Sequence, residues 1–151
     1  PLLLFNMHQP FITEASVADW NDNKKADFVN HVSGTVSAAQ NPSESDNILH
    51  RELYELLQMG MLGKITHEKV AECLSALGEK VPKEMIEESL CDVLWLVGEE
   101  AVELKDSKPE LKGSLASLAN QILSHKVANA DLLKERVSEE VLQEMALIKS
   151  A

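Results

Sequence analysis

Apolar residues recur at intervals of three and four along most of the chain, the spacing of a helix with one buried face. The first such series runs from Ser16 to a stop at Asn41-Pro42, and its members are Val17, Trp20, Phe28, Val32, Val36 and Ala39. This series predicts one helix, either continuous or interrupted near 21–23.

Three further helices are predicted before residue 105. The second begins near 43–46 and carries a stripe of Ile48, Leu49, Leu53, Leu56 and Leu57 before Gly60 and Gly63 end it. The third begins after Thr66 as N-cap and ends at Gly78, and the fourth begins at Pro82 and continues to about Gly98 or beyond. Apolar residues surround the fourth helix at 93–97, so we predict that it is the most buried and that Trp95 lies in the core.

The remaining helices are predicted from residues that commonly occupy the N-cap position of a helix. Ser107-x-x-Glu110 has the form of a capping box, Asn129 stands at the start of a sixth helix, and Ser138 precedes a last one. No strand pattern and no fixed-period repeat accompany them. We therefore predict an all-α fold, an antiparallel helical bundle or short helix-pair stack of six to seven helices.

Two regions follow from this division. Residues 1–14 lack a sustained helical period and predict an N-terminal arm that is either disordered or packed on the body. Residues 15–151 predict a single helical domain, in keeping with a length of 151 residues.

Charge, apolar run length and cysteine content limit the classes of partner and compartment that the sequence favours. The formal net charge of −11 would repel phosphate backbones and anionic membrane surfaces, so direct nucleic-acid binding is disfavoured. The longest apolar runs fall far short of the roughly 20 residues that span a bilayer, which predicts no membrane span. Cys73 and Cys91 form no CxxC pair and predict buried free thiols in a reducing compartment.

Candidate chemistry is sparse. The run from Asp19 to Asn23 begins like a calcium loop, but Lys24 replaces the required glycine and Asn30 the bidentate glutamate. His67-Glu68 lacks the second histidine of a zinc-protease helix, because residue 71 is alanine.

The other histidines, His8, His31, His50 and His125, fall on different elements. We therefore predict no catalytic, cofactor-binding or metal-binding residue, no cofactor, and no enzyme activity.

Three apolar residues are the predicted partner-binding positions. Trp20 lies among polar residues near the start of the first helix, where a core role and a partner-anchor role both stay open. Leu147 and Ile148 follow the last helix with no predicted helix to cover them.

Several short pieces in a fixed order resemble the N-terminal region of THO complex subunit 2 over about residues 16–151. They are Trp20 with Phe28 eight residues later, Leu53-Tyr54-Glu55-Leu56, Gly63, His67-Glu68, Leu74-Ser75, Leu133-Lys134-Glu135-Arg136 and Leu147-Ile148-Lys149. The segment from Leu53 to Leu77 carries most of this resemblance.

The resemblance implies a non-catalytic scaffold module of the nuclear THO/TREX complex, which couples transcription to mRNA processing and mRNA export. It implies that the partners are other THO complex subunits or the rest of a full-length chain, and that the protein resides in the nucleus. The family's helicase-binding and RNA-binding regions lie outside these residues. The alternative is a free-standing acidic helical protein-protein adaptor outside THO.

Overall fold

The computed structural model describes residues 8–148 of the chain. These residues form eight α-helices and no strand, so the predicted all-α class is confirmed. The helices are α2 (Glu14–Val17), α3 (Asp22–Ser37), α4 (Pro42–Met61), α5 (His67–Leu77), α6 (Lys83–Glu103), α7 (Glu110–Ser124), α8 (Ala130–Arg136) and α9 (Glu139–Glu144).

The predicted count of six to seven helices is therefore slightly low. The difference arises in the first predicted helix, which the structure divides into α2 and α3. Asp19 takes a φ of 54°, outside the helical region, and the Asn21 side chain accepts a hydrogen bond from the Lys24 backbone N–H. A left-handed residue followed by a new N-cap ends one helix and starts another.

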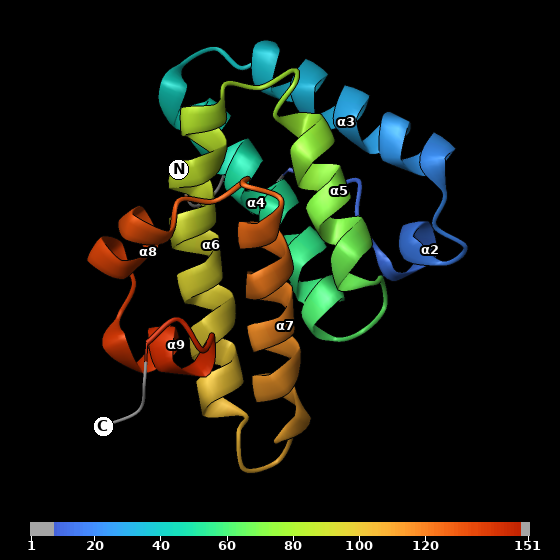
Figure 1. Cartoon of the computed structure of the whole chain (residues 1–151). Coiled ribbons are helices and arrows are strands. Elements are labelled where there is room, and N and C mark those ends of the chain that lie inside the picture. The colour runs from blue at the N-terminus through green and yellow to red at the C-terminus, as the bar shows by residue number, and fades with distance from the viewer. Residues whose placement is uncertain (1–7, 149–151) are drawn as a thin grey trace.

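The long helices pack side by side, and the predicted antiparallel arrangement holds only in part. Helices α6 and α7 run in opposite directions, whereas α4 and α6 run in the same direction, since His50 meets Asp92 and Tyr54 meets Glu100. In Figure 1, α6 and α7 lie side by side and are joined by a short loop at one end of the molecule. Helix α4 packs on α6, α5 packs on α7, and α3 packs against α4 and α5. The short helices α8 and α9 fold back onto α6, so α6 has neighbours on several sides.

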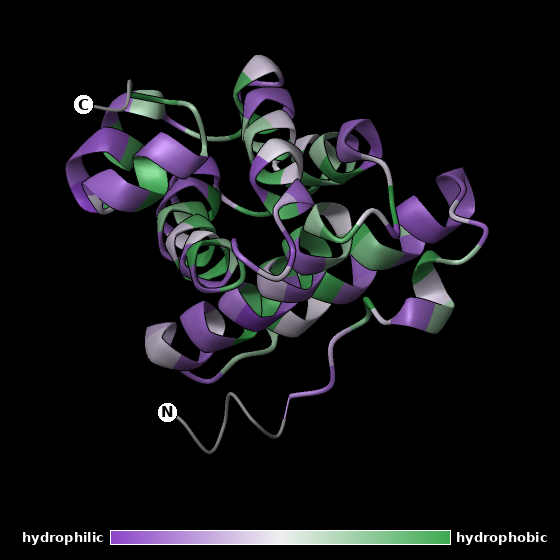
Figure 2. Ribbon diagram, turned by 90° about the horizontal axis from the view of Figure 1, so that it is seen from below, coloured by the Kyte–Doolittle hydropathy of each residue, from purple (hydrophilic) through white to green (hydrophobic). Residues whose placement is uncertain are grey.

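The predicted stripe of α4 faces the core. Leu53, Leu56 and Leu57 are fully buried, as are Val70, Leu74 and Leu77 of α5. Figure 2 shows the hydrophobic residues turned mainly toward the interior and the hydrophilic ones mainly outward. None of the helices in the described part of the chain is long and apolar enough to cross a bilayer.

Most predicted helix starts are confirmed. The side chains of Thr66, Asn129 and Ser138 accept hydrogen bonds from the backbone N–H groups of the helices that follow. The prediction of a capping box at Ser107 is wrong. Helix α7 begins at Glu110 after Pro109, and the Ser107 hydroxyl donates a hydrogen bond to the Leu104 carbonyl. Ser107 completes the turn after α6 instead of starting α7.

Gly60, predicted to end a helix, lies inside one, and the helix predicted to continue to about Gly98 or beyond does extend past Gly98. Gly60 belongs to α4, and a Cβ at this position would lie 2.9 Å from Val70 Cγ2 of α5. Gly98 belongs to α6 and would meet Val141 Cγ1 of α9. Their missing side chains therefore allow neighbouring helices to approach, while Gly63, with a φ of 78°, forms the turn after α4.

Candidate protein-binding face between α4 and α6

One side of α6 is left partly uncovered by the helices that pack on it. It carries Asp92, Trp95, Leu96 and Glu99, whose spacing of three and four residues places them on the same side. Trp95 is 37% exposed and Leu96 is 47% exposed.

The prediction that Trp95 lies in the core is therefore wrong. The run 93–97 is apolar on nearly all sides, but α4, α7, α8 and α9 cover only part of this circumference. Val93, Leu94 and Val97 are buried, whereas Trp95 and Leu96 remain on the uncovered side. Hydrophobicity alone does not distinguish these two groups.

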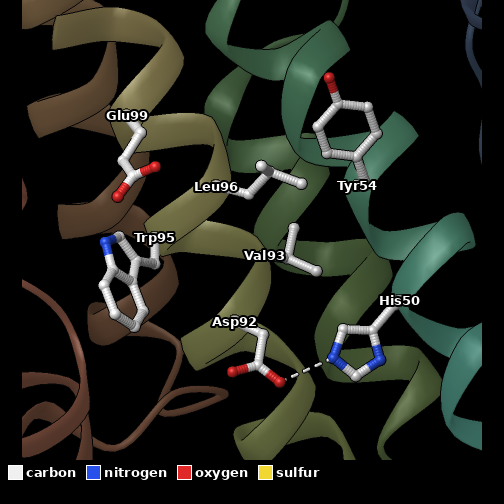
Figure 3. Close-up of a pocket in the computed structure, with 7 residues that line it drawn as sticks. All are labelled: His50, Tyr54, Asp92, Val93, Trp95, Leu96 and Glu99. Atoms are coloured by element: carbon white, nitrogen blue, oxygen red, sulfur yellow. Dashed lines mark hydrogen bonds and ion pairs between the residues drawn. The ribbon is translucent and has the colours of Figure 1, made fainter.

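Helix α4 supplies the other wall of a groove of ≈ 380 Å³. His50 and Tyr54 project from α4 toward α6, and the buried side chain of Val93 lies between the two helices (Figure 3). Leu96 points toward this gap, while Trp95 and Glu99 project from the other flank of α6. The face thus combines an apolar centre with polar side chains at its edges.

His50 and Asp92 join the walls at one end of the groove. The His50 Nε2 atom lies 2.8 Å from Asp92 Oδ2, and Nδ1 lies 2.6 Å from the Asp46 carbonyl oxygen one turn earlier in α4. The imidazole is thus contacted at both nitrogens and held in one orientation. A His–carboxylate pair also occurs in hydrolytic triads, but among residues 8–148 no serine, threonine or cysteine lines this groove.

A second polar link joins the helices at the opposite end. The Tyr54 hydroxyl donates a hydrogen bond of 2.5 Å to Glu100 Oε1, and the Gln58 amide donates to the Tyr54 oxygen at 3.1 Å. Burial, followed by the hydrogen bond to Glu100, raises the pKa of Tyr54 well above its usual value. The phenol therefore stays protonated and keeps donating to Glu100 at neutral pH.

Fixed walls, an apolar floor and exposed Trp and Leu side chains are features of a surface that binds protein. Aromatic residues are enriched among the side chains that dominate binding energy at interfaces. A groove between two helices suits an amphipathic helix, which lays its apolar face into such a site. The acidic groups of Asp92 and Glu99 would favour basic residues beside the apolar ones of that helix.

The three predicted partner-binding residues lie elsewhere. Trp20, Leu147 and Ile148 are each half-buried and pack against the hydrophobic core, and none lines the groove. Their partner-binding role stays a prediction. Sequence reasoning missed Leu96, although its position between Asp92 and Glu99 on one helical face was a usable signal.

The sequence model of a protein family described as THO complex subunit 2 N-terminus matches residues 12–151. No curated protein and no solved structure matches the chain.

Proposed function

The chain belongs to the THO complex subunit 2 N-terminal family, and from this premise we propose that it is a non-catalytic scaffold module of the nuclear THO/TREX complex. In this role it supports the assembly of THO subunits that act in mRNA processing and mRNA export. The family match over residues 12–151 is the observation that carries the proposal.

The architecture supports a scaffold role. Packed helices hold the α4–α6 groove in a fixed shape, and the polar links at both of its ends restrict side-chain movement. A preorganised surface loses little conformational entropy when a partner docks. The module can therefore present one binding face without rearrangement.

We propose that the groove receives an amphipathic helix of another THO subunit. Its apolar side chains would pack on Trp95 and Leu96, and its lysine or arginine side chains would lie near Asp92 and Glu99. The net charge of −11 favours a basic partner segment and disfavours direct contact with an RNA phosphate backbone. The partner is accordingly a protein.

A capture experiment with matched variants tests both statements. The purified chain is immobilised in nuclear extract, and bound THO subunits are identified by mass spectrometry and then retested as purified proteins. The variant Trp95→Ser/Leu96→Ser removes the exposed apolar groups of the groove. The control Leu62→Ser/Leu104→Ser removes two side chains of similar exposure, 41% and 38%, that do not line it.

We expect the native chain and the control to bind THO subunits and the groove variant to bind at least about tenfold more weakly, since truncating a central anchor typically costs 2 kcal/mol or more. Equal binding by all three proteins would reject the groove as the contact but retain the scaffold role. Absence of THO subunits on a chain shown to be folded by circular dichroism would reject the scaffold role.

A further inference from the structure

Glu52 is a charged residue at a core position. It lies on α4 between Leu49 and Leu53, and its side chain is fully buried, with 0% exposure. Burying a carboxylate is costly unless hydrogen bonds and positive charge replace the lost water. The groups that surround Glu52 therefore determine what this position does.

Two histidines meet the same oxygen of this carboxylate. His31 Nε2 from α3 lies 3.1 Å from Glu52 Oε2, and His8 Nε2 from the N-terminal arm lies 2.5 Å from it. The three candidate ligand atoms all lie within 4.8 Å of one another. Three segments that are distant in sequence thus direct two nitrogens and one oxygen at a common point.

We propose that His8, His31 and Glu52 form a binding site for a divalent transition-metal ion, with zinc as the ion that best fits these ligands. Zinc binds imidazole nitrogen and carboxylate oxygen at about 2.0–2.2 Å, which places the ligand atoms of a tetrahedral site about 3.3 Å apart. The two nitrogen–oxygen separations, 2.5 and 3.1 Å, differ from this value by less than about 1 Å, and the two nitrogens lie within 4.8 Å of each other.

The surroundings of Glu52 orient its carboxylate for this role. The other oxygen, Oε1, accepts a hydrogen bond of 2.9 Å from the Phe11 backbone N–H, which leaves Oε2 facing both imidazoles. Metal-binding carboxylates are commonly held by such a second hydrogen bond. The site therefore includes a fixed ligand and its orienting partner.

An apolar wall and an entry route complete the site. The Phe11 ring packs 5.7 Å from the His31 ring and 6.0 Å from the Phe28 ring, measured between centroids, and so covers one side of the cluster. The His31 side chain is 35% exposed, which leaves a path for an ion from solvent. Two imidazoles favour zinc over calcium or magnesium, which prefer oxygen ligands alone.

Metal binding would fasten the N-terminal arm. His8 belongs to the arm, whereas His31 and Glu52 belong to α3 and α4, so one ion would join three segments. Three protein ligands leave a fourth position for water or for a side chain of a partner. This inference rests on the cluster alone and does not depend on the proposed scaffold role.

The test is direct titration of the untagged, chelator-treated chain with Zn²⁺ by isothermal calorimetry, with Co²⁺ absorbance as a probe of coordination. His8→Gln, His31→Gln and Glu52→Gln each remove one ligand while keeping a side chain that can hydrogen-bond. The control is His125→Gln. His125 follows α7, lies outside the cluster, and contacts the Gln121 carbonyl through Nδ1.

We expect one Zn²⁺ per chain, a visible Co²⁺ band, and at least about 10- to 100-fold weaker zinc binding in each of the three variants but not in His125→Gln. Zinc at 100 times the dissociation constant should raise Tm of the native chain by about 5–10 °C. No zinc binding by the folded native chain, or equal binding by the ligand variants and the control, would overturn the site and leave a hydrogen-bonded clamp.

Discussion

Tyr54 is the single tyrosine of the chain, so its ionisation can be observed without interference from another phenol. Burial and Glu100 raise its pKa in the folded protein. The folded state therefore keeps a proton that the unfolded chain releases at about pH 10. Above that pH the unfolded state binds fewer protons, and the free energy of unfolding falls as the pH rises.

We expect the tyrosinate absorbance of the native chain to appear at a clearly higher pH than that of the chain in denaturant. A near-ultraviolet pH titration measures both, and Tyr54→Phe supplies the blank. Coincident native and denatured titrations would contradict the hydrogen bond to Glu100.

Residue-scale burial could be predicted from sequence where apolar residues form a clean stripe, as at Leu53 and Leu56. It failed at Trp95, because an apolar run on α6 does not state which of its sides a neighbouring helix will cover. The predicted free buried thiols are confirmed at Cys73 and Cys91. Burial raises the pKa of Cys73 to about 12 and that of Cys91 to about 11.

At the scale of elements, the absence of a side chain at Gly98 allows α9 to pack closely against α6. Gly98→Ala would force its methyl group against the stiff side chain of Val141, and such overpacking costs about 1–3 kcal/mol. A gain in helix propensity of about 1 kcal/mol offsets only part of this cost. We therefore expect Gly98→Ala to lower the free energy of unfolding, as measured by urea denaturation.

Gly34 provides a matched control in a helix. It lies in α3, it is exposed, and no atom of the described residues would lie within 4 Å of an added methyl group. Gly34→Ala should raise the free energy of unfolding by about 0.5–1 kcal/mol. If both substitutions stabilise the protein, the close contact of α6 with α9 is wrong.

The starts of elements could be predicted better than their ends. Thr66, Asn129 and Ser138 each accept a hydrogen bond from the residue three positions later, so the local sequence contains the whole signal. Gly60 and Gly98 act through contacts with other helices, which the local pattern does not contain, and the helix end predicted at Gly60 is wrong. Tertiary packing decides the role of a helical glycine.

At the scale of the whole molecule, stability should be unevenly distributed. Helices α4 and α6 are 20 and 21 residues long and pack on each other, whereas α8 and α9 have only 7 and 6 residues. Helices this short are not stable without tertiary contacts. We expect α8 and α9 to open locally while the rest stays folded.

Hydrogen exchange read by mass spectrometry measures this difference. Amides of α8 and α9 should exchange at least about tenfold faster than those of α4 and α6, which corresponds to a difference of about 1.4 kcal/mol in opening free energy. Equal protection of α9 and α6 would show instead that the molecule opens as one unit.

The meeting of His8, His31 and Glu52 at one point could not be predicted from the sequence, because it depends on how three segments distant in the chain pack together. One part of the signal was present: Glu52 stands on the apolar stripe of α4, next to Leu53 and four residues before Leu56. An acid at such a position indicates a buried partner but does not identify it. The fold supplies the two histidines.

The uncovered side of α6 has a consequence for how such a module can evolve. Substitutions at Val93, Leu94 or Val97 disturb packing, whereas Asp92, Trp95, Leu96 and Glu99 are exposed and can vary without loss of the core. Partner choice and foldability are thus encoded by different positions of one helix. Related chains could acquire new partners through a few surface changes while inheriting the same architecture.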